Sequence, residues 1–394
     1  MPASPRTARA INDRLALRLL QEEGPLTAGQ LKQLTGLSRP TVADLVERLT
    51  DSGLISVVGE AGAQRRGPNA RLYGIVADRA HLAALDVRTE GVRLVVADLL
   101  GSVLAEASLP VEAGEETGAA VERAVALVER TAKEAGAERL HSVGVGAPGL
   151  IDPATGALRD SSGLPEWHRR LVEALRERLP ARVLVENETN LAALAEQRDG
   201  VTRDRDTFVL LWLGLGIGAA VVLDGRLRRG ASGGTGEVGF LPVPGTTGLP
   251  SATGCDGGFH SLAGSAAILD LAAGHGLAAA GEPVERAADV VREAVADGAS
   301  GFLDALADRV VLGAAAVVAV LDPGCVVLAG EVGRAGGAPL AERVAARLAV
   351  MSPLATEVRA GALGGGAVLR GALLMAREAA QDDVFAPRTH PSGG

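Results

Sequence analysis

Apolar residues near the start of the chain recur at the spacing of one helix face. Ile11, Leu15 and Leu19 follow one another every four positions, which predicts a first helix. A second helix begins at Thr27, where Gln30 stands three positions later in the arrangement of a capping box. Short helices that each bury one apolar side are typical of a small helical domain.

The third predicted helix carries, near its start, the polar residues from which a nucleic-acid contact is predicted. Ser38 is placed to cap it, and Pro40 is accepted in its first turn. Its buried stripe consists of Val42, Leu45, Val46 and Leu49. Two helices separated by a glycine turn predict a helix-turn-helix, in which the start of the second helix approaches bases and phosphates.

Two apolar segments, 54–58 and 71–76, follow this helix and flank a glycine-rich basic stretch. They predict a β-hairpin wing, which completes a winged helix-turn-helix. We expect DNA to be contacted by Ser38, Arg39, Pro40, Thr41 and Ala43 on the third helix and by Arg65 and Arg66 on the wing. A small three-helix domain that binds protein is the alternative interpretation of the same pattern.

From about residue 82 the pattern changes to short apolar runs that alternate with longer helical stretches, which predicts an α/β body. The predicted strands cover residues 82–87, 92–100, 142–146, 182–185, 208–215, 219–223 and 325–329. The predicted helices cover residues 117–135, 167–178, 190–199, 261–273 and 305–321. A strand–turn–strand unit at residues 92–106 is echoed at 218–227. This repetition predicts a duplicated lobe with a ligand cleft between the halves.

Composition and charge narrow the picture. The 394 residues are 47% hydrophobic and carry a net charge of −9, yet residues 1–80 hold a balance of +3. A mildly basic end on an acidic body fits contact with nucleic acid through that end. The chain has two cysteines, no apolar leader, and a longest uncharged apolar run of only residues 310–321. We therefore expect a soluble, cytoplasmic protein with no membrane partner.

Short segments of the body, taken in their order, resemble the ROK family of transcriptional repressors and sugar kinases. They are residues 86–98, 144–149, 186–190, 213–218, 236–239 and 328–333. The resemblance implies an actin/hexokinase-like two-lobe fold with a sugar in the cleft, and a winged helix-turn-helix of the repressor branch. We expect a DNA-binding domain over residues 1–77, a ligand-binding and oligomerisation domain over 78–380, and a disordered tail over 381–394.

The resemblance also bears on catalysis. In kinase members the first phosphate turn has the pattern Asp-x-Gly-Gly-Thr, whereas residues 86–90 here are Asp-Val-Arg-Thr-Glu. Side chains thus stand where a phosphate would touch bare backbone, and Glu90 adds negative charge beside a polyanion. The kinases' catalytic aspartate corresponds to Glu188, whose extra methylene displaces the carboxylate by about 1 Å. We expect no enzyme activity and no cofactor.

The sugar site that the resemblance implies is retained in part. We expect Asn187, Glu188 and Glu237 to bind the ligand. Glu188 could instead cap the helix that begins near residue 190, and Glu237 could tie the lobes together. Gly163 and Phe240 replace polar residues of the family pattern, so the pocket is less polar than a hexose site.

Family members commonly hold a structural zinc with one histidine and three cysteines. Phe240 takes the histidine position here. Near the cysteine positions Cys255 and His260 could be two ligands, and Asp256 a third. Because a structural zinc needs four nitrogen or sulfur ligands, we expect no bound metal.

These patterns predict a sugar-responsive DNA-binding transcriptional regulator, in the simplest case a repressor of carbohydrate metabolism genes. We expect a homodimer or a dimer of dimers that binds a palindromic operator and responds to a sugar or sugar-derivative effector. The alternatives are an ATP-dependent sugar kinase with an accessory DNA-binding domain and a regulator that works without ligand.

Overall fold

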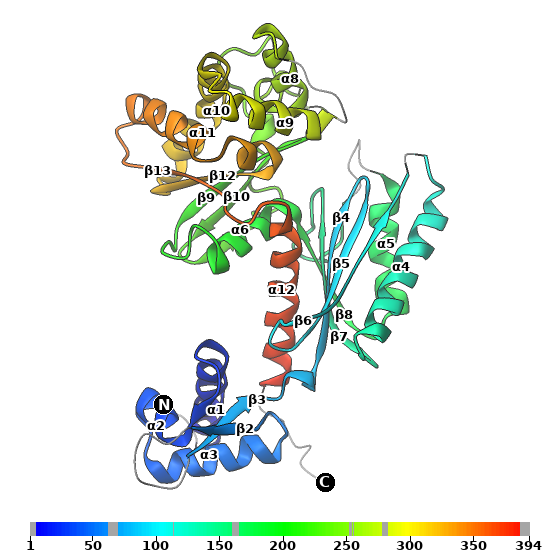
Figure 1. The fold of residues 1–394 in the computed structure, drawn as a ribbon, viewed down its shortest axis with the longest axis vertical. Helices are drawn as coiled ribbons and strands as arrows, with labels where there is room; N and C mark the ends of the chain where they lie inside the picture. The colour runs from blue at the N-terminus through cyan, green and yellow to red at the C-terminus, as the bar shows by residue number, and fades with distance from the viewer. Residues whose placement is uncertain are drawn as a thin grey trace.

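The computed structural model describes residues 5–61, 70–112, 114–159, 165–251, 254, 256–277 and 283–386. Three parts follow one another along the long axis of the molecule, with an N-terminal helical unit at one end (Figure 1). A first sheet-containing lobe lies in the middle and a second at the other end. The C-terminal helix runs from the region between the lobes back toward the N-terminal unit.

The N-terminal unit is a winged helix-turn-helix. Its elements are α1 (Pro5–Glu22), β1 (Leu26–Thr27), α2 (Ala28–Thr35), α3 (Arg39–Asp51), β2 (Ile55–Ala61) and β3 (Ala70–Ile75). The strands form an antiparallel sheet in the order β1-β3-β2. Thr27 and Gln30 make the predicted capping box, and Ser38 caps α3. The helix starts expected from the sequence are therefore confirmed.

The first helix buries a different face from the predicted one. Its buried side chains include Ala16, Leu17 and Leu20, whereas Ile11 is 58% and Leu15 is 38% exposed. The predicted helix is confirmed, but Ile11 and Leu15, two of the residues whose spacing predicted it, lie outside the core. The reason is tertiary, because α2, α3 and β3 all contact α1 and together select the side that is buried.

Two five-stranded sheets, one in each lobe, repeat the same topology. The first consists of β4 (His81–Arg88), β5 (Gly91–Asp98), β6 (Val103–Pro110), β7 (Leu140–Ala147) and β8 (Arg182–Asn187), in the order β6-β5-β4-β7-β8. The second consists of β9 (Phe208–Leu213), β10 (Ile217–Leu223), β11 (Arg226–Arg228), β12 (Cys325–Ala329) and β13 (Glu357–Ala360), in the order β11-β10-β9-β12-β13. In each sheet the first three strands pair with one another antiparallel. The last two strands continue the sheet in parallel. The predicted duplication is confirmed, with β5–β6 equivalent to β10–β11.

Helices cover the sheets on both faces. They are α4 (Thr117–Glu134), α5 (Glu166–Arg178), α6 (Glu188–Asp199), α7 (His260–Ala263), α8 (Ser265–Gly274), α9 (Pro283–Ala296), α10 (Ser300–Leu321), α11 (Gly330–Met351) and α12 (Ala367–Val384). On the first sheet α4 and α5 cover one face and α12 the other, while α6 packs between α12 and the second sheet. The single helix predicted over residues 261–273 is wrong, because Gly264 is extended and separates α7 from α8. None of the helices in the described ranges is both long and apolar enough to span a bilayer.

The C-terminal helix runs into the segment predicted as a tail. It continues to Val384. Gln381 is buried, and its Nε2 donates a hydrogen bond to the carbonyl oxygen of Leu99 at 3.0 Å, which anchors the last turn. Residues 387–394 of the predicted tail lie outside the described part of the chain.

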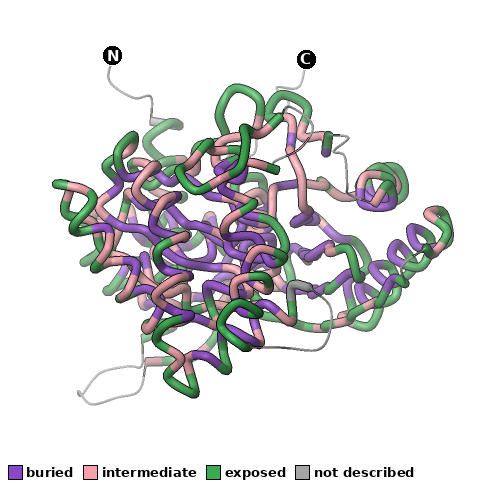
Figure 2. The backbone as a smooth tube through the Cα atoms, turned by 90° about the horizontal axis from the view of Figure 1, so that it is seen from above, coloured by how far each residue is buried: buried purple, intermediate pink, exposed green. Residues whose placement is uncertain are grey.

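The N-terminal unit and the first lobe share one apolar core. Leu17 of α1 belongs to the same buried cluster as Leu99, which follows β5, and Ala376 of α12. Buried positions run through the middle of the molecule and along the inner sides of the helices (Figure 2). An ion pair of 2.9 Å between Arg14 on α1 and Asp382 on α12 adds a polar contact at the rim. The winged helix-turn-helix is thus docked on the body and not tethered by a linker alone.

Candidate functional site

The start of α3 forms an exposed polar edge of the winged helix-turn-helix. Ser38, Arg39, Pro40 and Ala43 are exposed, and Thr41 is half-buried. The Thr41 N–H donates to the Ser38 hydroxyl oxygen at 3.3 Å, and the two hydroxyl groups share a hydrogen bond of 2.8 Å. The predicted α3 residues therefore lie together at a helix N-terminus, where the helix dipole favours negatively charged groups such as phosphates.

Arg39 offers a positive charge on this edge. Within the described ranges its side chain has no ion pair or hydrogen bond, so it is available to a ligand. Behind it, Arg48 holds α3 on α1 by an ion pair of 2.5 Å with Asp13. The predicted wing residues Arg65 and Arg66 lie outside the described residues.

The predicted ligand pair Asn187 and Glu188 lies where β8 runs into α6. Asn187 is the N-cap of α6, and its Oδ1 accepts a hydrogen bond from the Thr189 N–H at 2.9 Å. Its Nδ2 donates to the Gly149 carbonyl at 3.1 Å and to the Glu188 carboxylate at 2.7 Å. The amide is thus engaged within the protein and orients Glu188. The helix cap considered for Glu188 is provided by Asn187.

Negative charges surround Glu188. Burial, together with the negative charges of Glu237, Asp86 and Glu331, raises the pKa of Glu188 to about 8. Burial also raises the pKa values of Asp86 and Glu331. At neutral pH the Glu188 carboxyl group therefore keeps its proton, and it can donate as well as accept a hydrogen bond. That is the dual capacity that a hydroxyl-rich ligand needs.

Glu237 approaches the cleft from the second lobe. It precedes the short 3₁₀ helix η2 (Val238–Phe240), and its side chain is exposed. The charge of Glu237 raises the pKa of Glu188, although the two residues lie on different lobes. Phe240 is 38% exposed and adds an apolar surface near Glu237. Asn187 and Glu188 thus lie at the junction of β8 and α6, and Glu237 lies in the second lobe before η2. Their binding of a ligand stays a prediction.

Arg88 fills the turn that corresponds to the kinase phosphate loop. Its Nε and Nη2 atoms each lie 2.9 Å from the Asp86 Oδ2 atom, and Asp86 is only 1% exposed. Its Nη1 lies 3.7 Å from Oε1 of Glu331 at the start of α11, and its Nη2 donates to the Gly365 carbonyl at 3.2 Å. A Cβ atom at Gly214, in the second glycine turn, would come within 2.5 Å of the other Glu331 oxygen. Side chains of this protein therefore occupy both glycine turns.

Other polar residues of the cleft escaped the sequence analysis. Glu186 on β8 is 3% exposed and forms an ion pair of 2.5 Å with Arg229, which follows β11 on the second lobe. His168 on α5 is buried, with its Nε2 atom 3.2 Å from the Arg88 carbonyl. Glu186 belongs to the segment 186–190 that carried the family resemblance, whereas Arg229 and His168 belong to no motif. The loss of the two glycines at positions 88 and 89 was the available signal that the turn had changed its role.

The described residues contain no group of three or more histidine, cysteine, aspartate or glutamate side chains that could hold a metal ion. His260 begins α7, and burial lowers its pKa. Cys255, the other candidate zinc ligand, lies outside the described residues.

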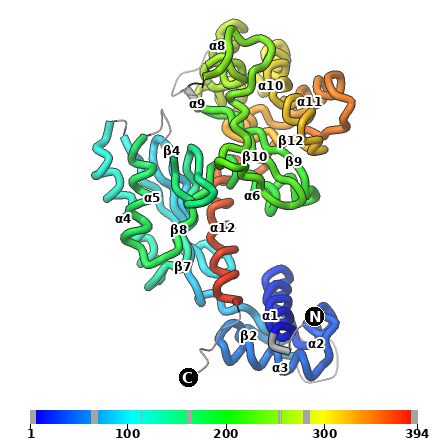
Figure 3. Tube along the Cα trace, turned by 180° about the vertical axis from the view of Figure 1, so that it is seen from behind, coloured from blue at the N-terminus to red at the C-terminus, as the bar shows by residue number. Residues whose placement is uncertain are grey.

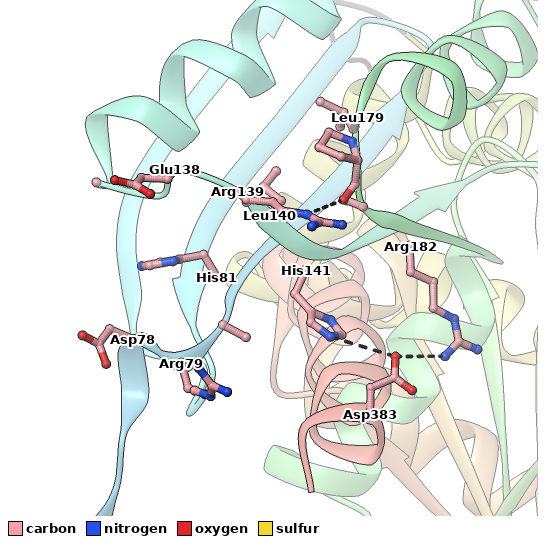
Figure 4. A pocket seen from close by; sticks show the side chains of 14 residues that line it. Asp78, Arg79, His81, Glu138, Arg139, Leu140, His141, Leu179, Arg182 and Asp383 are labelled. Carbon is pink, nitrogen blue, oxygen red and sulfur yellow. Dashed lines mark hydrogen bonds and ion pairs between the residues drawn. The ribbon is translucent and has the colours of Figure 1, made fainter. Parts of the chain in front are cut away.

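A separate open hollow of about 990 Å³ lies beside the connection between the N-terminal unit and the first lobe (Figure 4). Within it, Asp383 of α12 lies 4.0 Å from His141 and 3.9 Å from Arg182. Acidic side chains offset the basic ones along its wall, so charge alone selects no ligand there. None of the predicted cleft residues lines this hollow.

Comparison with known proteins gives matches for both parts of the chain. A ROK family model matches residues 82–379, and a MarR family model matches residues 11–67. The xylose repressor of Caldicellulosiruptor bescii is 24% identical over 60% of this chain and 59% of its own length. The DNA-binding transcriptional dual regulator NagC of Escherichia coli is 27% identical over 60% of this chain and 58% of its own length. The chain thus spans somewhat under two thirds of these curated relatives. The glucokinase of Thermotoga maritima is 32% identical over 58% of this chain and 78% of its own length.

Solved structures agree with the family models. A ROK family transcriptional regulator, a homologue of the Escherichia coli MLC protein, matches with a TM-score of 0.75 at 22% identity and covers 96% of this chain and 98% of its own. A ROK family glucokinase from Streptomyces griseus, solved with glucose and AMPPNP, matches with a TM-score of 0.62 at 23% identity and covers 76% and 100%. The predicted fold, a winged helix-turn-helix before a two-lobe actin-like domain, is confirmed. Its sheets, its glycine turns and the match over residues 82–379 together establish that the chain belongs to the ROK family.

Proposed function

We propose that this chain is a DNA-binding transcriptional regulator, in the simplest case a repressor, whose cleft senses a sugar or a sugar derivative. Residues 1–77 read DNA, residues 78–380 hold the effector and the subunit contacts, and the site of action is the cytoplasm. The observation that carries the proposal is the joining of an exposed, capped α3 to a two-lobe body through one shared apolar core. A change between the lobes can therefore reach the DNA-binding unit through packed side chains.

The names of the relatives support both halves of this proposal. They combine repression with a sugar, as in "xylose repressor" and "N-acetylglucosamine repressor". The reading surface fits DNA because α3 presents Arg39 and capping hydroxyls at its N-terminus, and Arg65 and Arg66 are placed by the sequence on the wing.

A further part of the proposal is that the cleft transfers no phosphate. Arg88 and Glu331 fill the space of the phosphate turns, and a glutamate replaces the catalytic aspartate of the kinases. A nucleotide would also bring negative charge toward the carboxylates of Asp86 and Glu331.

We also propose that two copies bind one palindromic operator. Each copy carries a single reading helix, and a two-fold symmetric dimer sets two such helices about 34–36 Å apart, one turn of DNA. A dimer of dimers would bring two operators together. Sedimentation of the protein with and without a single operator fragment distinguishes the two assemblies.

The DNA half of the proposal is tested by selection of bound fragments from genomic DNA. The affinity for the enriched fragment is then measured by fluorescence anisotropy over a range of salt concentrations. We expect the logarithm of the affinity to fall with the logarithm of the salt concentration, by about 0.9 for each phosphate neutralised. No enrichment, or an affinity independent of salt, would contradict DNA binding.

The effector half is tested by thermal unfolding with a panel of pentoses, hexoses, hexosamines and their N-acetyl derivatives. A ligand at 100 times its Kd stabilises the folded state by about 2.7 kcal/mol, so the right sugar raises Tm. The same sugar is then expected to change operator affinity. If no member of the panel shifts Tm, the ligand-independent regulator becomes the better account.

A sugar kinase is the second candidate, because the matched glucokinase is 32% identical and the glycine turn at residues 214–218 is retained. A coupled assay for ADP release with the same sugar panel tests it. Turnover that disappears in the Glu188→Gln variant would overturn the proposal of an inactive cleft.

A further inference from the structure

Arg88 contacts three parts of the body at once. It lies at the end of β4 in the first lobe and is paired there with the buried Asp86. Its Nη1 faces Glu331, which belongs to the second lobe because α11 follows β12. Its Nη2 donates to the Gly365 carbonyl in the 3₁₀ turn η3 (Gly364–Gly366), directly before α12. A single guanidinium group therefore bridges the cleft and the start of α12.

Neighbouring contacts strengthen the same junction. Arg93 on β5 donates a second hydrogen bond to the Gly365 carbonyl at 2.9 Å. Arg229 and Glu186 form another ion pair between the lobes. At its far end α12 reaches the DNA-binding unit, where Asp382 pairs with Arg14. The path of α12 from the cleft to that unit is visible from both sides of the molecule (Figure 3).

We propose that Arg88 is a clasp between the two lobes, which takes the place of a bound nucleotide in the turn and fixes the cleft end of α12. Asp86 orients the guanidinium group, and Glu331 and the Gly365 carbonyl are its partners across the cleft. A glycine at position 88 would leave these partners apart. The clasp itself follows from the contacts of Arg88, whereas its effect on DNA binding rests on the proposed function.

The geometry suits a contact that opens and closes. Arg88 and Glu331 keep 27% and 32% of their side chains exposed, and their charged atoms are 3.7 Å apart. Such a pair contributes little to stability, so it can be broken without unfolding either lobe. The buried Asp86 contact stays within one lobe and keeps Arg88 in position. A cleft ligand that favours a different angle between the lobes would shift the balance between clasped and open forms.

The clasp is tested by measuring the distance between the lobes. Spin labels are attached at Lys133→Cys on α4 and Glu342→Cys on α11, both exposed, after Cys255→Ser and Cys325→Ala have removed the native thiols. Pulsed electron paramagnetic resonance then gives the distribution of label distances. We expect Arg88→Ala to broaden this distribution and shift it to longer distances. Glu331→Gln, which keeps the side-chain shape, is expected to change it in the same direction.

Arg123→Ala is the matched control, because Arg123 pairs with Glu115 entirely within the first lobe. It is expected to leave the distribution unchanged. Unchanged distributions in both Arg88→Ala and Glu331→Gln would overturn the clasp. If Arg88→Ala fails to fold, Glu331→Gln alone decides the result.

Operator affinity tests the second half of the inference. Opening the clasp is expected to change affinity for the selected DNA fragment by about 5- to 150-fold, the usual range of coupling between sites. A changed distance distribution with unchanged affinity would overturn the link from the clasp to DNA. A chain that binds no DNA in any form would contradict the proposed function, while the distance measurement would still decide the clasp.

Discussion

At the scale of single residues, the protonation of the Glu188 carboxyl group makes the stability of the folded chain depend on pH. Its pKa is about 8 in the folded chain against an ordinary value of 4.5. Between these values the folded state binds more protons than the unfolded state. The stabilising contribution of the protonated group is therefore complete below about pH 4.5 and is lost as the pH rises through about 8.

Replacing Glu188 by Gln removes this titration and keeps the side-chain shape. We expect the Glu188→Gln variant to be more stable than the parent at pH 8.5 and close to it at pH 4.5. The upper bound of the gain is about 5 kcal/mol at about 1.36 kcal/mol for each pKa unit, reduced by the partial exposure of the group. Thermal unfolding across the pH range measures it. Glu173→Gln, at an exposed position of α5, is the control and should show no such trend.

Arg39 offers the most direct test of the DNA contact proposed for the start of α3. Its charge is exposed at the start of α3 and has no partner in the described part of the chain. We expect Arg39→Ala to weaken specific operator binding by about 1–3 kcal/mol if it contacts a base. Fluorescence anisotropy measures the loss, and Arg130→Ala on α4 controls for net charge. Equal affinities of the two variants would remove Arg39 from the DNA interface.

At the scale of elements, close approach of α12 to the first sheet explains a glycine motif. A Cβ atom at Gly144 on β7 would lie 2.1 Å from the Ala372 carbonyl oxygen of α12. At Gly146 it would lie 2.6 Å from a methyl group of Val368. These glycines belong to the segment that carried the family resemblance, and packing alone is enough to require them.

Gly144→Ala should therefore push α12 away from the sheet. We expect a loss of stability of at least about 1–3 kcal/mol, as for other overpacked cores. Chemical denaturation measures the loss. Gly248→Ala, at a position with open space around it, is expected to have little effect. A Gly144→Ala variant as stable as the parent would show that the contact between α12 and β7 adapts easily.

At the scale of the whole molecule, α12 joins regions that are far apart in the sequence. Its N-terminal end meets the Arg88 contacts at the cleft, and its C-terminal turn meets both β5 and α1. The winged helix-turn-helix and the first lobe share buried side chains around this helix. A shift of α12 would therefore change the position of the winged helix-turn-helix relative to the body.

Gln381 tests how firmly the C-terminal turn is anchored. In a Gln381→Ala variant the buried Leu99 carbonyl loses its donor, which costs about 1–3 kcal/mol. Thermal unfolding should show this loss. Asp382→Ala removes the exposed pair with Arg14 and should cost less than about 1 kcal/mol. If the two variants lose the same stability, the buried hydrogen bond is not what holds the turn.

Local patterns were enough for much of this fold. Helix caps at Thr27 and Ser38 depend on side chains within three residues, and the sequence displays them directly. Strand spans follow from short apolar runs, and the echo of 92–106 in 218–227 revealed the repeated lobe. Capping and strand patterning act over a few residues, so a single sequence contains the information they need.

The sequence by itself predicted the winged helix-turn-helix, the repeated lobe and the candidate residues Asn187, Glu188 and Glu237, but not the helices α9, α11 and α12. Only the tertiary structure decided which side of α1 is buried, and that Asn187 caps α6 while it orients Glu188. It also decided the pairing of Arg88 with Glu331, which lie far apart along the chain. The physical reason is that burial and ion pairing depend on contacts between segments far apart in the sequence. A local sequence pattern carries no information on those contacts.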